Sequence, residues 1–371
     1  MKFRDILFFL LSILLLSSCE QTGNSILIGF SGQLSGPGST PSTMVRNAVI
    51  LAAEQINERG GINGRPIELL IKNDRGIPDQ ALKADRELFA AGVELIIGHT
   101  TSTMSTAVLD YINENEIVML SPTSSAAYLM EKDDYFFSIF PSNRQLAEAS
   151  AEFACANFEG TEITAIVDSF NSIYTVDYSN HFRRSIEAYC NFSFARLDYD
   201  STMDPDFRML LNEALNLDPD ILMLVSGSLD TAMMVQQLYK RGLNIPVIGV
   251  EWAENQELID QGGPYVENIY ISNLTSPGIR NTKSQKFRTE YFQRFNTEAL
   301  SSAVMGYEAM LIAAEALERK KAKQSLKEVL LGTTFQGLQD NISFDAYGDV
   351  NRRIYIHSIR EGRFITVQSA K

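Results

Sequence analysis

The sequence predicts an α/β protein built from two doubly wound lobes. Three observations support this prediction. Strand and helix signals alternate along most of the chain, which is typical of parallel βαβ units. The alternation runs in two series, separated near residues 140–143. The length of 371 residues also suits two domains with a core each.

The first series begins with a short apolar strand and an amphipathic helix at residues 45–58. The apolar residues of this helix recur at helical spacing, and the Arg59-Gly60-Gly61 sequence ends it. The strands expected in this series are 26–30, 67–72, 93–97 and 117–120. The helices expected between and after them are 45–58, 78–91 and 103–115.

The second series repeats the alternation and is followed by a helical tail. Its expected helices are 144–158, 177–189, 205–217 and 229–241. Its expected strands are 163–167, 192–197, 221–225, 247–249 and 269–272. The tail predicts helices at 282–295, 302–320 and 325–331, and then alternating strands near 342–344, 353–359 and 364–367.

The N-terminus has the pattern of an export signal. Lys2 and Arg4 precede an apolar run, 6–16, which is too short for a bilayer-spanning helix of about 20 residues. The run ends in Leu-Ser-Ser-Cys19, which resembles a bacterial lipobox. We therefore expect a signal peptide at 1–18, lipidation of Cys19 and a tether at 19–24. The alternatives are a plain secretory signal and an uncleaved anchor.

Composition excludes several classes of function. The formal net charge of -14 argues against binding nucleic acid through its phosphates. Three histidines and three cysteines leave little material for a zinc site, and we expect no metal and no cofactor. In an oxidising compartment Cys155 and Cys190 either form a disulfide or remain as two buried thiols.

In doubly wound sheets, ligands bind beyond the carboxyl ends of the strands. This rule selects the loops at 31–42, 98–103, 121–126, 168–174, 226–230 and 251–255. The loops at 98–103 and 121–126 are rich in hydroxyl groups and contain neither Arg nor Lys. Such loops suit a carboxylate, which accepts several hydrogen bonds. Ser102 or Thr103 could instead simply cap the following helix.

Two other loops offer a carboxylate and aromatic rings. Glu251 ends a predicted strand and could pair with an ammonium group, although a solvated loop acid is the alternative. Trp252, the only tryptophan, could wall a cation site beside it or simply pack in the core. Asp168 and Tyr174 lie on another loop of this set, with structural and functional roles equally open.

Several segments resemble the branched-chain amino-acid-binding proteins of ABC importers, which are type 1 periplasmic binding proteins. The resemblance covers nearly all of residues 25–367, and the segments that carry it are 28–37, 52–64, 96–103, 118–125 and 248–251. It implies a Venus-flytrap fold with two lobes, three crossover strands and a ligand in the cleft between them. The implied first lobe is 25–140 with 275–335, and the second is 141–274 with 336–371.

The resemblance also implies roles for single residues. The contacts to a ligand α-carboxylate fall on Thr103, Thr123 and Ser125, and the acid that binds the ammonium falls on Glu251. The aromatic residue of the second lobe falls on Tyr174. The complete set of expected ligand-binding residues is Thr103, Thr123, Ser124, Ser125, Tyr174, Ser228, Glu251 and Trp252.

The sequence departs from the family where aromatic residues usually surround an aliphatic side chain. Pro41 and Ser228 occupy two of these positions, and a third falls near Ser302. We therefore expect a side-chain pocket that is roomier or more polar than one built for leucine.

The expected function is that of an extracytoplasmic lipoprotein that captures an amino acid or a related small molecule and delivers it to an ABC permease. The alternative is a ligand-sensing receptor of the same fold that works with a membrane sensor. We expect a monomer, held at the membrane only by its lipid. We do not expect an enzyme, and we expect His99 to be a structural loop residue rather than a partner of Ser102 in catalysis.

Overall fold

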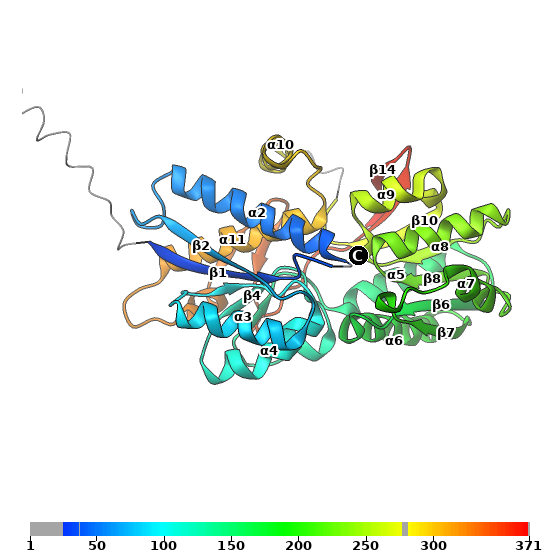
Figure 1. Ribbon diagram of the computed structural model, residues 1–371, viewed down its shortest axis with the longest axis horizontal. Helices are drawn as coiled ribbons and strands as arrows, with labels where there is room; N and C mark the ends of the chain where they lie inside the picture. Colours follow the sequence, from blue (N-terminus) through cyan, green and yellow to red (C-terminus); the bar gives the residue numbers. More distant parts are fainter. Residues whose placement is uncertain (1–24, 37, 277–280, 370–371) are drawn as a thin grey trace, which may run out of the picture.

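The computed structural model describes residues 25–36, 38–276 and 281–369, which form two α/β lobes side by side (Figure 1). The expected signal peptide and Cys19 lie outside the described residues. The first lobe holds a parallel sheet of order β2-β1-β3-β4-β5. Its strands are β1 (Ile26–Gly32), β2 (Ile67–Asn73), β3 (Ile96–Ile97), β4 (Met119–Ser121) and β5 (Phe136–Ser138). Among the described residues, no helix is long and apolar enough to cross a bilayer.

Helices cover both faces of the first sheet. On one face lie α2 (Ser39–Glu58) and α11 (Ser301–Arg319), and on the other lie α3 (Pro78–Ala90) and α4 (Ser102–Glu114). Alternation along the strands assigns side chains to the two faces. Ile97 packs in the cluster with α2 and α11, whereas its neighbour Ile96 packs with α3 and α4.

The second lobe holds a larger sheet of order β14-β13-β10-β9-β8-β6-β7. Its parallel strands are β6 (Glu162–Asp168), β7 (Ser193–Tyr199), β8 (Ile221–Val225), β9 (Val247–Gly249) and β10 (Ile269–Asn273). The last strands, β13 (Tyr355–Arg360) and β14 (Arg363–Ser369), join β10 in antiparallel pairing. The predicted fold class of two doubly wound lobes is therefore confirmed.

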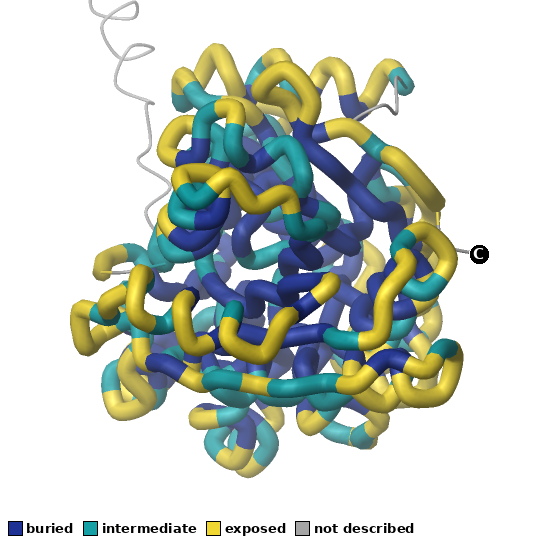
Figure 2. The backbone as a smooth tube through the Cα atoms, turned by 90° about the vertical axis from the view of Figure 1, so that its right-hand side faces the viewer, coloured by how far each residue is buried: buried dark blue, intermediate teal, exposed yellow. Residues whose placement is uncertain are grey.

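The helices of the second lobe also form two layers. One layer contains α5 (Asn143–Asn157) and α6 (Ser172–Tyr189), and the other contains α7 (Phe207–Leu215), α8 (Ser228–Lys240) and α9 (Gln256–Gly262). Cys155 on α5 forms a disulfide with Cys190 at the end of α6, so the first of the two alternatives for these cysteines holds. The strands and inner helix faces are buried and the outer helix faces exposed (Figure 2).

The chain passes between the lobes three times: between β5 and α5, between β10 and α10 (Thr282–Phe295), and before β13. The third passage comes later than expected. Residues 336–348 stay with the first lobe, because Phe344 packs edge-on against Phe137 at 5.2 Å between ring centroids and Gly348 O accepts a hydrogen bond from Ser138 N. The remaining elements between α11 and β13 are α12 (Leu326–Leu331), β11 (Thr334–Gln336) and β12 (Asn341–Ser343).

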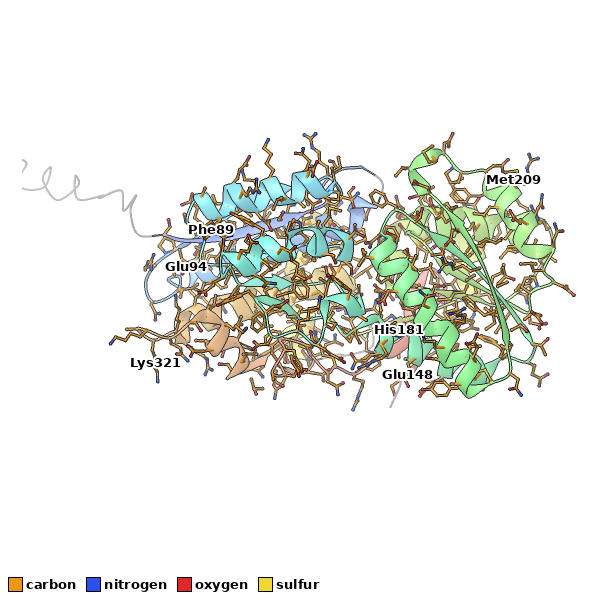
Figure 3. All side chains as sticks on the ribbon, turned by 90° about the horizontal axis from the view of Figure 1, so that it is seen from below. Phe89, Glu94, Glu148, His181, Met209 and Lys321 are labelled. Carbon is orange, nitrogen blue, oxygen red and sulfur yellow. A yellow bond between two sulfur atoms is a disulfide. The ribbon has the colours of Figure 1, made fainter. Side chains whose placement is uncertain are left out.

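Most expected elements are present with shifted ends, and three short ones were not expected: β5, β11 and α9. The shift that matters for the site is at α6, which begins at Ser172 rather than at residue 177. Tyr174 therefore lies in the first turn of a helix rather than on a loop. Figure 3 shows the two lobes from below, with Phe89 and Lys321 on the first and His181 and Met209 on the second.

Candidate functional site

A pocket lies where the two lobes meet, and loops at the carboxyl ends of strands from both lobes line it. It encloses about 550 Å³ of empty space, part of it open to solvent. The first lobe contributes Gly38, Pro41, Ser42, Thr100, Thr101, Ser102, Thr123, Ser301 and Ser302. The second lobe and the passages between the lobes contribute Phe140, Asn171, Tyr174, Glu251, Trp252 and Asn273.

Among the described residues that line this pocket, Glu251 is the only charged one. It begins the short 3-10 turn Glu251–Ala253 that follows β9. The Tyr174 hydroxyl donates a hydrogen bond to Glu251 Oε2 at 2.6 Å. Burial raises the pKa of Glu251 to about 7, although the hydrogen bond from Tyr174 opposes this shift. The free carboxylate is thus poised to gain a cationic partner near neutral pH.

Trp252 connects the second lobe to the first. Its ring packs edge-on against Tyr174, with 6.4 Å between ring centroids. On its other side it reaches Gly38, where an added Cβ would come within 3.1 Å of Trp252 Cζ2. Gly38 has φ +72°, so glycine suits both the backbone conformation and this close approach. The ring therefore closes one side of the pocket across both lobes.

The N-terminus of α4 forms another part of the pocket wall. The N-cap residue Thr101 makes no side-chain capping hydrogen bond. Ser102 Oγ accepts hydrogen bonds from the backbone N–H groups of Ser125 and Ala126, each at 3.2 Å, so its own proton remains available to donate. A helix N-terminus with free hydroxyl donors is a favourable place for an anionic group.

Hydrogen bonds across the junction hold the lobes against each other. The Thr103 hydroxyl in the first lobe donates to Asn171 Oδ1 in the second at 2.8 Å. Ala127 N donates to Asp177 Oδ2, also at 2.8 Å. Together with the packing of Trp252 on Gly38, these contacts describe a closed arrangement of the lobes.

The structure brings together four of the eight expected ligand-binding residues. Thr123, Tyr174, Glu251 and Trp252 all line the pocket. The other four are outside its lining and their hydroxyls have protein partners.

The expected residues outside the lining act as supports. Thr103 bonds Asn171, and the Ser125 hydroxyl donates to Asn143 Oδ1 at 2.8 Å. Ser124 Oγ donates to His99 O at 3.1 Å, and Ser228 donates to Glu257 on α9. None of these four side chains lines the pocket in this structure, and the Thr103 hydroxyl instead reaches across the junction to Asn171, which does.

Sequence reasoning missed several residues of the pocket. Thr101 and Ser102 belong to a loop that it selected, where the helix start, one residue earlier than expected, changes which hydroxyls face inward. No pattern in the sequence singled out Asn171, Asn273 or Ser301 individually. Pro41 and Ser302, two of the positions where the family's aromatics are absent, do line the pocket, whereas Ser228 does not.

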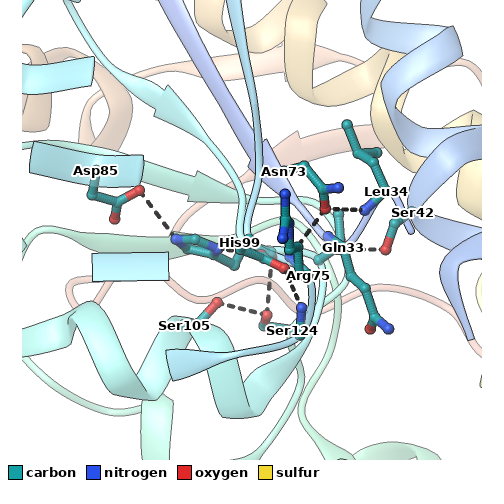
Figure 4. Close-up of polar contacts among 12 residues, drawn as sticks. Gln33, Leu34, Ser42, Asn73, Arg75, Asp85, His99, Ser105 and Ser124 are labelled. Carbon is teal, nitrogen blue, oxygen red and sulfur yellow. Dashed lines mark hydrogen bonds and ion pairs between the residues drawn. The ribbon is translucent and has the colours of Figure 1, made fainter. Parts of the chain in front are cut away.

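His99 belongs to the loop that carries Thr101 and Ser102, and Figure 4 shows its contact with Asp85 beside Ser105 and Ser124. Its ring is fully buried, with Nδ1 at 2.7 Å from Asp74 Oδ2 and Nε2 at 3.1 Å from Asp85 Oδ1. Its carbonyl accepts from Ser121 Oγ and Ser124 Oγ. Burial alone would lower the pKa of His99, but Asp85 and Asp74 raise it to about 10. His99 is outside the pocket lining and serves as a charged internal support.

This arrangement predicts a pH-dependent stability. The folded-state pKa of His99 lies above the unfolded value of about 6.5, so its stabilisation is complete below pH 6.5 and is lost as pH rises through about 10. We expect His99→Gln to reduce the free energy of unfolding most at pH 6, and the gap from wild type to narrow toward pH 10. The control Ser193→Ala, at an exposed position that carries no titratable group, should change stability little at any of these pH values. Urea unfolding at several pH values measures both, and a gap for His99→Gln that does not narrow would contradict the assignment.

Within the described residues, no group of three or more His, Cys, Asp or Glu side chains could hold a metal ion. The pocket lining offers hydroxyl groups, amide groups and a carboxylate, which can form hydrogen bonds and pair with a charge. In the described lining, one carboxylate and the N-terminus of a helix belong to the same pocket at the junction of the two lobes.

Comparison with known proteins agrees with this geometry. Residues 25–363 match the family model described as periplasmic binding protein. The leucine-, isoleucine-, valine-, threonine- and alanine-binding protein of Pseudomonas aeruginosa is 21% identical over 348 residues, which are 93% of this chain and 92% of that protein.

Solved structures share the fold. The branched-chain amino acid transporter substrate-binding protein of Streptococcus pneumoniae, in complex with isoleucine, has a TM-score of 0.82 at 20% identity and covers 93% of this chain and 99% of its own. A solute-binding protein of an ABC transporter from Rhodopseudomonas palustris, in complex with 3,4-dihydroxybenzoic acid, has a TM-score of 0.83 at 18% identity, with coverage of 94% and 98%. The chain therefore belongs to the periplasmic binding protein family, as a type 1 member related to the Leu/Ile/Val-binding proteins.

Proposed function

We propose that this protein captures an amino acid in the pocket between its lobes and delivers it to an ABC permease. The observation that carries the proposal is the pairing of opposite electrostatic features in one pocket. Glu251 lies on the second lobe, and the N-terminus of α4, whose N-cap residue Thr101 makes no side-chain capping hydrogen bond, lies on the first. A zwitterion has charges of both signs at a fixed short separation, so one ligand can engage both features.

The ammonium end of the ligand would bind Glu251. With a pKa of about 7, this carboxyl group is largely ionised above neutral pH, and the described residues of the lining offer it no cationic partner. Tyr174 holds one oxygen of the carboxylate, and Trp252 offers a ring edge and face beside it. An ammonium group would remove the penalty of the buried, unpaired charge.

The carboxylate end would bind the N-terminus of α4. Thr101 and Ser102 present hydroxyls there, and Thr123 lines the pocket from the next loop, with its hydroxyl donating to Thr100 O at 2.8 Å. In the described lining no Lys or Arg is present, so uncharged donors would bind the negative end. We therefore assign binding of the ligand carboxylate to neighbours of Thr103 and Ser125 in the same loops. The hydroxyls of Thr103 and Ser125 themselves are bonded to asparagine side chains.

The N-terminal sequence and the family support a proposal for the cellular location of the protein. We propose that residues 1–18 direct export, that Cys19 carries the lipid, and that the folded lobes act outside the cytoplasmic membrane as a monomer. The relatives with branched-chain amino acids in their names support an amino acid as cargo, while the dihydroxybenzoate complex shows that this fold also accepts other carboxylates. The chemistry of this pocket, with its carboxylate, favours the zwitterion over an aromatic acid.

Isothermal titration calorimetry with the twenty L-amino acids and with benzoate tests the proposal. We expect at least one amino acid to bind with a dissociation constant of about 1 μM or lower, equivalent to about -8 kcal/mol. Benzoate should not bind, because it would leave Glu251 unpaired. Binding of benzoate but of no amino acid would contradict the proposed cargo.

A further inference from the structure

We propose that the cargo is an amino acid with a short, uncharged, hydrogen-bonding side chain, a hydroxyl or carboxamide, rather than a branched aliphatic one. The inference rests on the proposed function, because it assigns the part of the pocket that remains once Glu251 and the α4 N-terminus hold the two charged ends. That remainder combines the apolar groups of Pro41, Phe140 and Trp252 with a polar wall formed by Ser42, Thr100, Asn171, Asn273, Ser301 and Ser302.

The lining has no aliphatic wall. Among the described residues that surround the pocket there is no Leu, Ile, Val, Met or Ala, and the apolar contacts come from Pro41 and three aromatic rings. An aliphatic ligand side chain gains by removing apolar surface from water against other apolar groups. Against hydroxyls and amides it would instead strip water from polar groups without replacing their hydrogen bonds.

Several polar groups in this wall keep hydrogen-bonding capacity for a ligand. Ser301 Oγ donates to Asn273 Oδ1 at 2.6 Å, which leaves its lone pairs free to accept. Ser42 Oγ and Thr100 Oγ1 are 2.6 Å apart and share one hydrogen bond, so one of the two hydroxyl protons remains to be donated elsewhere. The wall therefore presents both a donor and acceptors, the combination that a hydroxyl or a carboxamide can match.

Buried hydrogen bonds fix the side-chain amide of Asn273, the partner of Ser301. Asn273 Nδ2 donates to Glu254 Oε2 at 3.0 Å, and the same oxygen lies 2.9 Å from His357 Nδ1. Both Glu254 and His357 are buried. This network fixes the amide of Asn273 with its oxygen toward Ser301, so the pocket cannot adapt to an apolar side chain by turning that amide.

Ligands with an acidic or a basic side chain are excluded because the extra charge would have no partner in the pocket. The described part of the lining contains no Lys, Arg or His, so a second carboxylate on the ligand would be buried there without a partner. Glu251 is the only acid among these described lining residues and would pair with the ammonium group, so a basic side chain would likewise be unpaired. Unpaired buried charges are strongly unfavourable.

Isosteric ligand pairs test the inference by calorimetry. Threonine and valine differ by one hydroxyl in place of a methyl group, and asparagine and leucine have similar shapes. We expect the polar member of at least one pair to bind about tenfold or more tightly than its apolar counterpart, because a site built for hydrogen bonds rejects an analogue that lacks them.

Single substitutions test which side chains of the pocket favour the polar ligand over its apolar counterpart. Ser301→Ala and Ser42→Ala should each reduce the polar-to-apolar affinity ratio, whereas Ser193→Ala, at an exposed position of the second lobe, should leave it unchanged. Melting temperatures of the variants confirm that they fold. Valine and leucine binding as tightly as threonine and asparagine, or more tightly, would overturn this inference and leave the proposed function standing. Binding of no amino acid at all would overturn both.

Discussion

Glu251→Gln is expected to weaken amino-acid binding by about 100-fold or more at pH 8. Truncating one partner of a buried, hydrogen-bonded charge pair costs about 2–5 kcal/mol of binding free energy, because the other charge is left buried and unpaired. Glutamine retains the shape of the side chain and can still accept the hydrogen bond from Tyr174, so the change removes little except the charge. Calorimetric titration measures the loss.

The pH dependence of amino-acid affinity is a second test of the role of Glu251. Because the pKa of Glu251 in the free protein is about 7, protonation below that pH competes with the ligand. Wild-type affinity should fall by about tenfold per pH unit below pH 7 and level off above it, and the residual binding of Glu251→Gln should lack this dependence. Asp260→Asn, an exposed acid on α9, is the control and should behave as wild type. Unchanged affinity in Glu251→Gln would refute the ammonium role.

Arg352→Met is expected to lower the free energy of unfolding by about 3–5 kcal/mol, as is typical when one partner of a buried ion pair is removed. Arg352 lies on the third passage between the lobes, and its Nη1 is 2.8 Å from Glu308 Oε2 on α11. The two side chains are 3% and 0% exposed. Glu308 Oε1 also accepts from Leu338 N at 2.7 Å, so the pair ties the third passage to the first lobe.

The adjacent arginine provides a matched control. Arg353 is exposed, so Arg353→Met should change stability by no more than about 0.5 kcal/mol. In the double variant Arg352→Met with Glu308→Gln, no buried charge is left, and much of the loss should be recovered. Chemical denaturation measures all four proteins. Equal effects of the two arginine substitutions would show that the buried pair does not contribute to stability.

The architecture could be predicted from the sequence because it depends on local patterns. Apolar strands of the second lobe such as β8, buried along its whole length, and amphipathic helices such as α2 follow from the spacing of their apolar residues. The elements that were missed are too short for a period to show. β5 has three residues and follows a charged segment, and its strand geometry comes from pairing with β4.

The site was predictable only in part, because a pocket between lobes depends on distant segments meeting. The rule that ligands bind at the carboxyl ends of strands selected the loops that hold Thr123 and Glu251. It could not decide which hydroxyls of a loop face the pocket, since this depends on the residue at which α4 begins. Ser301 and Asn273 meet in the pocket through the passages between the lobes, which follow no local sequence pattern.

The lobe boundary after β12 shows the same limitation. Phe344 looks like part of a strand, and only its packing against Phe137 and Phe335 shows that it stays with the first lobe. Sequence patterns predict that a segment is extended, but the tertiary contacts decide which sheet or core it joins.

Calorimetry with modified ligands tests most directly whether both ends of a zwitterion are bound. Once the tightest-binding amino acid is known, its N-acetyl derivative removes the positive charge and its carboxamide removes the negative one, while the side chain is unchanged. If Glu251 and the α4 N-terminus each hold one end, both derivatives should bind at least about 100-fold more weakly than the parent. Equal binding by either derivative would contradict the account, because the corresponding charge would then have no role in recognition.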